Sequence, residues 1–153
     1  MNLQEELKAL KERIAELEER AKEEQEFPQA GEDYWYMNAL GIIFNDKWSG
    51  SISEEEMLEI GNVFKTKEQA EFAAEKLKVE AELRKFSKPF EYGGNNYTFN
   101  YYHEKENIVK FLASKMYQDP GALYFESTDQ VEEAIESVGK ERIKKYIFGV
   151  EAE

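Results

Sequence analysis

The sequence has no cysteine and only one histidine, His103, among its 153 residues. Without cysteine there are no disulfides, no thiolate zinc sites and no cysteine nucleophile. With one histidine, any metal site would have to be built from carboxylates. The Ser/His/Asp order, HExxH, the phosphate loop and GxGxxG are also missing. We therefore predict a protein that is not an enzyme and has no cofactor or metal.

Long apolar runs and positive charge are also scarce. No apolar run approaches the length of a membrane span, and the Glu- and Lys-rich N-terminus resembles neither a signal nor a transit peptide. There are 33 acidic and 20 basic residues, a net charge of −13, and acids outnumber bases in every third of the chain. A positive stripe for phosphate is therefore absent, and we expect no contact with membrane or direct contact with nucleic acid. An acidic surface favours solubility or a basic partner.

Residues 2–26 predict a long amphipathic helix. Its apolar positions follow heptad spacing: Leu3, Leu7, Leu10, Ile14, Leu17 and Ala21. Isoleucine at position a with leucine at d favours a parallel two-stranded coiled coil. In such a dimer Glu6 would face Lys11 of the second copy, and Arg13 would face Glu18. We predict a homodimer through this helix; the alternative is a helix folded back on its own domain.

The 10 Phe, 9 Tyr and 2 Trp indicate that the rest of the chain is folded. We expect the heptad helix to occupy residues 1–27 and a linker 28–32. An α+β domain would follow over 33–150, made of two repeats, 33–88 and 90–150.

Two similar helix starts in the sequence indicate the repeats. Residues 64–70 and 125–131 share a phenylalanine, then a hydroxyl residue, then a glutamine. Thr66 and Ser127 are typical N-cap residues, and a glutamine three positions later predicts a capping box at each.

The elements of the first repeat follow from alternation and turn residues. We expect a hairpin of residues 34–37 and 42–48, an exposed acidic excursion at 53–56, a short strand at 59–64 and a helix over 67–87.

The second repeat has the same order. We expect a hairpin of residues 97–103 and 108–113, a short strand at 123–125 and a helix that ends at Gly139. Residues 141–148 are either a helix or a strand.

The helix at 67–87 is apolar on two opposite faces, which predicts that it is sandwiched. One face holds Ala70, Ala73, Ala74, Leu77 and Ala81, and the other Phe72, Val79, Leu83 and Phe86. A charged flank lies between them. The bulky face is covered by the rest of the domain, by the N-terminal helix or by a partner chain.

Several features could carry chemistry, but each has a simpler interpretation. His103 could act as a base, yet a lone histidine beside a turn is usually plain surface. Alternating aromatics at 97–102 could stack nucleic-acid bases, yet they also fit a half-buried strand. The run Glu54, Glu55, Glu56 with Glu59 matches no calcium loop and favours a solvated acidic face.

Two segments resemble small proteins of phages and prophages of Gram-positive bacteria. The first is residues 59–71 with 75–79; the second combines residues 124–127, 134–135, 138–139, 142–146 and 148–150. The resemblance covers roughly residues 33–150 and excludes the heptads. It implies a phage origin, an accessory role, and a location in the cytoplasm of an infected or lysogenic bacterium. Some small acidic phage proteins inhibit host nuclease defences, including CRISPR effectors.

We therefore predict an α+β protein: a coiled-coil helix followed by two tandem ββα-like units that share one core. As a function we predict a non-enzymatic phage protein that binds a basic surface of a host nucleic-acid enzyme, as an anti-CRISPR protein would, including by mimicry of nucleic acid. The residues expected to bind this partner are Glu54, Glu55, Glu56, Glu59, Glu71, Glu75 and Glu82. The alternatives are a structural assembly protein whose coiled coil sets the oligomeric state, and an enzyme that uses His103.

Overall fold

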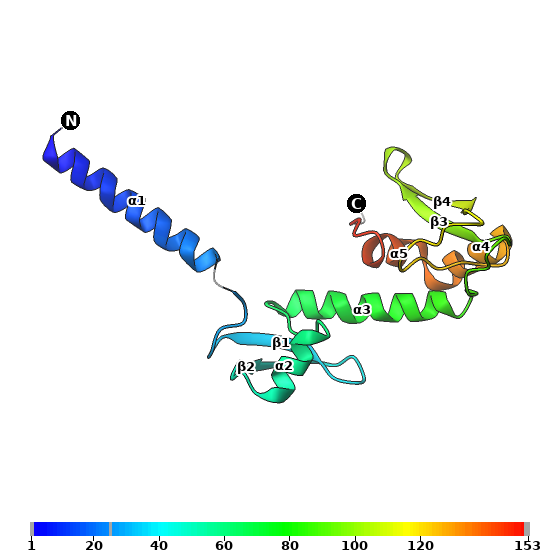
Figure 1. The fold of residues 1–153 in the computed structure, drawn as a ribbon, viewed down its shortest axis with the longest axis horizontal. Coiled ribbons are helices and arrows are strands. Elements are labelled where there is room, and N and C mark those ends of the chain that lie inside the picture. Colours follow the sequence, from blue (N-terminus) through cyan, green and yellow to red (C-terminus); the bar gives the residue numbers. More distant parts are fainter. Residues whose placement is uncertain (1, 25, 152–153) are drawn as a thin grey trace. The chain divides into compact units, whose positions relative to one another are not determined.

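The computed structural model describes residues 2–24 and 26–151, which form five α-helices, one 3-10 helix and two antiparallel hairpins (Figure 1). This content confirms the predicted α+β class. The chain divides into two compact units, Met1–Ala70 and Glu71–Glu153. The division falls inside α3 (Lys67–Arg84), and the repeats 33–88 and 90–150 stay a prediction.

The first unit begins with α1 (Leu3–Glu23), which confirms the predicted N-terminal helix. Asn2 caps it: its side-chain oxygen accepts from the Glu5 N–H at 2.9 Å, and the Glu5 carboxylate accepts from the Asn2 N–H at 3.2 Å. This capping box satisfies two backbone donors and fixes where the helix begins.

The first hairpin pairs β1 (Asp33–Met37) with β2 (Ile43–Lys47), as predicted. The side-chain oxygen of Asn38 accepts hydrogen bonds from the N–H groups of Leu40 and Ile42, which closes the turn. Tyr34 of β1 and Trp48, the residue after β2, are buried, and the centroids of their rings lie 5.5 Å apart in an edge-to-face contact.

The segment after this hairpin differs from the prediction. Residues 53–56 are exposed as predicted except for Glu54, which is buried, but they form part of a helix, α2 (Ile52–Glu59), which Ser51 caps. The strand expected at 59–64 is also wrong, since α2 runs to Glu59 and only Phe64 bridges to β1, through Trp35. The capping box of Ser51 and Glu54 supplies the physical reason for a helix here.

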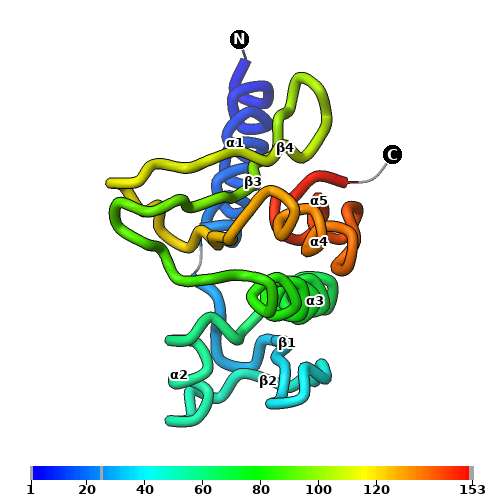
Figure 2. Tube along the Cα trace, turned by 90° about the vertical axis from the view of Figure 1, so that its right-hand side faces the viewer, coloured from blue at the N-terminus to red at the C-terminus, as the bar shows by residue number. Residues whose placement is uncertain are grey.

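In the second unit, β3 (Tyr97–Tyr102) pairs with β4 (Asn107–Leu112) through η1 (His103–Lys105), which confirms the second hairpin. The predicted strand at 123–125 forms bridges only at Tyr124 and Phe125. Helix α4 (Thr128–Val138) follows, and the undecided C-terminal element is the helix α5 (Lys140–Tyr146). Figure 2 shows α4 and α5 next to the β3–β4 hairpin.

Both predicted N-cap bonds form, but the return bond of a full capping box is not found at Ser127 among the described residues. The Thr66 hydroxyl accepts from the Gln69 N–H at 3.2 Å, and the Ser127 hydroxyl accepts from the Gln130 N–H at 3.1 Å. The Gln69 side chain reaches back to the N–H of Lys65, one residue before the expected position.

One core cluster of buried apolar side chains lies in the second unit. Its members are Val79, Leu83, Phe99, Ile108, Phe125, Val131, Ala134, Ile135, Val138 and Ile143. The bulky face of α3 contributes to it, and so does the predicted inner face of β3, whose Tyr97 and Tyr101 pack against it. Tyr34 and Trp48 of the first unit are not members, so the cluster is not the single core expected for both repeats.

Candidate interaction surfaces

Glu54 is the most tightly held carboxylate of the first unit. Its side chain accepts from the Ser49 hydroxyl at 2.5 Å, from the Ser49 N–H at 3.1 Å and from the Ser51 N–H at 3.0 Å. The residue is only 7% exposed. A partner cannot reach this carboxylate, so we remove Glu54 from the predicted binding residues.

The surroundings of Glu54 shift two pKa values. The Ser49 hydroxyl lowers the pKa of Glu54 most, and the hydrogen bonds from Ser51 and Tyr34 bring it to about 2, although burial acts in the opposite direction. Burial raises the pKa of Tyr34, and its hydrogen bond to Glu54 raises it further. Both shifts favour a charged Glu54 beside a neutral Tyr34.

The remaining acids of α2 behave as predicted for a surface. Glu55, Glu56 and Glu59 are exposed, and none forms an ion pair in the part of the chain that the structure describes. Sequence reasoning treated the four glutamates alike because it assigned no helix to them. The pattern Ser51-x-x-Glu54 was the available signal, since it is that of a capping box.

The predicted acids of α3 are less uniform. Glu75 pairs with Lys78 at 2.9 Å, and Glu82 pairs with Arg142 of α5 at 2.6 Å. Glu71 is exposed. The ion pair of Glu82 lies inside the second unit and joins two helices, so it favours a structural role for Glu82 over partner binding.

The heptad residues of α1 are exposed. The side chains of Leu7, Leu10, Ile14 and Leu17 are 46–61% exposed, and Leu3 is 83% exposed. Ala21 is exposed as well, and no residue of α1 is buried. A row of large apolar side chains on one helix face is typical of a surface that another chain covers.

His103 is exposed at the start of η1. Its ring meets the ring of Tyr101 edge to face at 4.8 Å. The neighbouring Glu104 accepts from the Tyr102 hydroxyl at 3.1 Å. Within the described residues His103 has no hydrogen bond to a carboxylate, which a general base would use for orientation.

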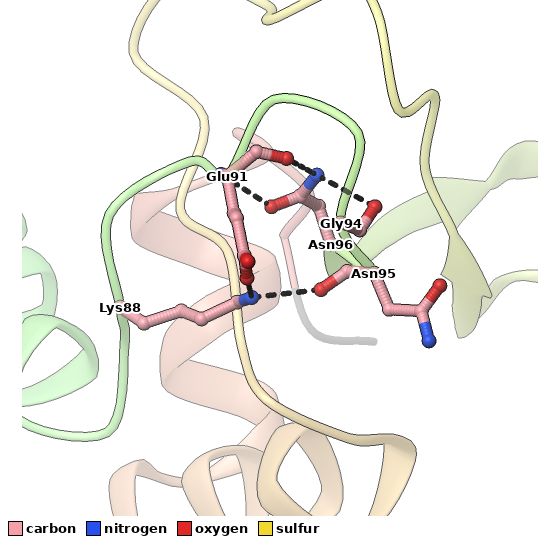
Figure 3. A network of polar contacts seen from close by, with 5 residues as sticks. All are labelled: Lys88, Glu91, Gly94, Asn95 and Asn96. Atoms are coloured by element: carbon pink, nitrogen blue, oxygen red, sulfur yellow. Dashed lines mark hydrogen bonds and ion pairs between the residues drawn. The ribbon is translucent and has the colours of Figure 1, made fainter.

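A polar network holds the loop before β3 (Figure 3). Asn96 is fully buried; its carboxamide accepts from the Glu91 N–H at 2.8 Å and donates to the Glu91 carbonyl at 2.9 Å. The Lys88 ammonium donates to the Asn95 carbonyl at 2.8 Å. The loop so fixed presents Tyr92, whose side chain is 77% exposed. Exposed tyrosines on ordered loops are common at protein interfaces.

A cavity of about 460 Å³ lies in the second unit beside β3. Its apolar lining includes Leu83, Phe99 and Phe148, and its polar lining includes Arg84 and Asp119. The volume is in the range of sites that bind small molecules or peptide side chains. This cavity could not be predicted from the sequence, because its lining comes from five separate segments.

Among the described residues, no three His, Cys, Asp or Glu side chains are placed to hold a metal ion. None of the described helices combines the length and apolar character needed to cross a bilayer. No protein-family model, no curated protein and no solved structure matches this chain.

Proposed function

We propose that this protein is a non-enzymatic interaction protein that binds a basic surface of a protein partner through the acidic face of α2. The observation that carries this proposal is the contrast among the α2 glutamates. Glu54 is buried and anchors the helix, while Glu55, Glu56 and Glu59 are exposed without ion pairs in the described chain. A fixed helix with unneutralised charges is well suited to electrostatic recognition, which speeds association and selects partners.

The net charge of −13 supports the same partner chemistry, because a strongly acidic protein attracts basic surfaces over several ångströms. The resemblance to small phage proteins implies a phage accessory role, and the acidic character shared with phage inhibitors of host nucleases leads us to propose a host nucleic-acid enzyme, including a CRISPR effector, as the partner. The protein would then act in the cytoplasm of the bacterium as a phage accessory protein that inhibits a host defence.

A second copy of the chain is the proposed occupant of the α1 seam. The side chains of Leu7, Leu10 and Ile14 are exposed by half or more, and the flanking charges are complementary in a parallel pair. Dimerisation would present two acidic faces to the partner. The structural alternative, in which the coiled coil only sets the oligomeric state, rests on the same seam.

The two hairpins also support the proposed origin from one repeated unit. Each is followed by a residue that bridges back to its first strand, and then by a capped helix: Phe64 with Thr66, and Phe125 with Ser127. We infer that residues 33–88 and 90–150 are two versions of one hairpin-plus-helix pattern.

The test reverses the exposed acids together, as Glu55→Lys, Glu56→Lys and Glu59→Lys. Affinity purification from phage-infected cells first identifies the partner, and calorimetry at several salt concentrations then measures its binding. We expect the triple variant to bind at least about tenfold more weakly and with a reduced salt dependence.

The matched control reverses three exposed acids of the second unit that form no ion pair in the described chain: Glu126, Glu133 and Glu136. It changes net charge equally and should retain most of the affinity. Equal affinity of the α2 variant and the wild type would sink the proposal. Recovery of phage structural proteins alone would favour the assembly alternative.

A further inference from the structure

In both hairpins the first strand also pairs with a phenylalanine later in the chain, along the edge that faces away from its hairpin partner. Trp35 of β1 exchanges backbone hydrogen bonds with Phe64 at 2.9 and 2.8 Å. Tyr97 of β3 exchanges the equivalent bonds with Phe125 at 3.1 and 2.8 Å. In both hairpins, therefore, the first strand has a short third neighbour on the side opposite its hairpin partner.

The next outward-facing position differs between the hairpins. Backbone polar groups of alternate residues in an antiparallel strand point to the same side. Met37 therefore follows Trp35 on the outer edge of β1, and Phe99 follows Tyr97 on that of β3. The Asn62 carboxamide closes the edge at Met37: it accepts from the Met37 N–H at 2.9 Å and donates to the Met37 carbonyl at 2.8 Å.

Phe99 has no such closure. The alternation directs its N–H and C=O away from β4, and no side chain or other backbone segment of the described chain bonds to them. The position that Asn62 holds, two residues before the bridging phenylalanine, is occupied by Leu123. Leucine has no amide to offer. Phe99 as a whole residue is 8% exposed. Backbone donors and acceptors in folded proteins are normally paired, so an unpaired pair at a strand edge is available to a ligand.

The open edge coincides with the cavity of the second unit. Phe99 lines this cavity of about 460 Å³, and Leu123 lies on its wall. The cavity therefore offers a backbone donor–acceptor pair together with an apolar space beside it. Domains that add a peptide strand to a sheet edge use this combination, since the backbone pair gives affinity and the space selects a side chain.

We propose that the β3 edge at Phe99 binds an extended peptide segment of a partner protein, with one apolar side chain in the cavity. A peptide group carries the same donor and acceptor as the Asn62 carboxamide, which occupies the equivalent edge of β1. The site lies in the second unit and does not depend on the acidic face of α2.

The first experiment uses nuclear magnetic resonance on the full-length, nitrogen-15-labelled chain. Hydrogen exchange in the free protein should be slow at the Met37 N–H and faster at the Phe99 N–H. The probe is the peptide acetyl-Thr-Val-Leu-Val-Thr-amide, which has no charge and no side-chain amide. Its addition should shift the Phe99 amide resonance and slow its exchange.

Two N-methylated peptides provide the matched controls. One is methylated on both valine nitrogens, and the other on the leucine and C-terminal threonine nitrogens. Because consecutive N–H groups of a strand point to opposite sides, the two methylated sets lie on opposite edges of the peptide and only one of them faces Phe99. One methylated peptide should bind about tenfold more weakly than the parent and the other should bind like it.

A protein variant tests the same edge from the other side. Leu123→Asn places a carboxamide where the first unit has Asn62, so it should protect the Phe99 N–H and weaken binding of the probe. Leu112→Asn, on an exposed leucine of β4 outside the cavity lining, serves as its control. If Leu123→Asn does not fold, the pair of methylated peptides decides alone.

Three results would overturn the proposal. They are Phe99 protection in the free protein equal to that of Met37, no response of Phe99 to millimolar probe, and equal binding of the two methylated peptides.

Discussion

Asn62 holds Met37 by both of its backbone polar groups, with hydrogen bonds of 2.9 and 2.8 Å across 25 residues of sequence. Asn96 makes the same pair of bonds to the backbone of Glu91, at 2.8 and 2.9 Å. In each case one carboxamide makes the two backbone hydrogen bonds that a neighbouring strand would otherwise make, because it carries a donor and an acceptor in one plane.

Replacing Asn62 by alanine should destabilise the first unit. The Met37 N–H and carbonyl would lose their partners, and leaving part-buried polar groups unpaired costs about 1–3 kcal/mol. Urea unfolding followed by tryptophan fluorescence measures the effect, since both tryptophans, Trp35 and Trp48, lie in this unit. The control is Asn95→Ala, whose side chain forms no hydrogen bond in the described chain. Equal stability of the two variants would show that the Asn62 clamp contributes nothing.

Stability of the first unit should fall in acid through Glu54. Its pKa is lowered from 4.5 to about 2 in the folded protein, so its charged form favours folding. This contribution is complete above about pH 4.5 and is lost as the pH falls towards 2. Glu54→Gln should lower the stability of the first unit near neutral pH. It should also reduce the fall of this stability in acid, which unfolding followed by tryptophan fluorescence measures. The neighbouring variant Glu55→Gln should keep the wild-type dependence, and an unchanged curve for Glu54→Gln would contradict the assignment.

The α1 seam predicts a dimer that depends on residues before the linker. Light scattering should find a dimer for the full chain and a monomer for a version that begins at Gln29. Glu6→Lys alone should weaken the dimer about fivefold by placing like charges across the interface, and Glu6→Lys with Lys11→Glu should restore it. A monomeric full chain would mean that the seam packs within its own chain.

Removal of the Ser127 cap should lower the stability of the second unit. Ser127→Ala removes the acceptor for the Gln130 N–H and should cost about 1 kcal/mol of stability. Ser137→Ala changes an exposed serine of the same helix and should be neutral or slightly stabilising, because alanine is the better helix former. Urea unfolding monitored by far-ultraviolet circular dichroism compares the two. An equal loss in both variants would argue against the cap.

Much of this fold could be predicted from local sequence patterns. The hairpins, the heptad helix and the caps at Thr66 and Ser127 depend on residues close together in sequence, and all of them form. Glu54 was misassigned because the acids Glu54, Glu55 and Glu56 with Glu59 look exposed by composition, whereas Glu54 is only 7% exposed and accepts hydrogen bonds from Ser49 and Ser51.

The open edge at Phe99 was beyond prediction for a related reason. It follows from the difference between Asn62 and Leu123, and that difference matters only once each is placed beside the first strand of its hairpin. The shared spacing around Phe64 and Phe125 indicates that the repeats are alike. The effect of having Asn62 in one and Leu123 in the other is visible only in the structure.

Gly139 serves two helices at once. Its N–H donates to Ile135 at the end of α4, and its carbonyl accepts from Ile143 in the first turn of α5. Its φ of +107° is one that other residues rarely adopt. Helix α5 leads from Gly139 directly to Ile147 and Phe148, which line the cavity, although Gly139 itself does not. We therefore expect a substitution at Gly139 to move these two residues and to change the shape of the cavity.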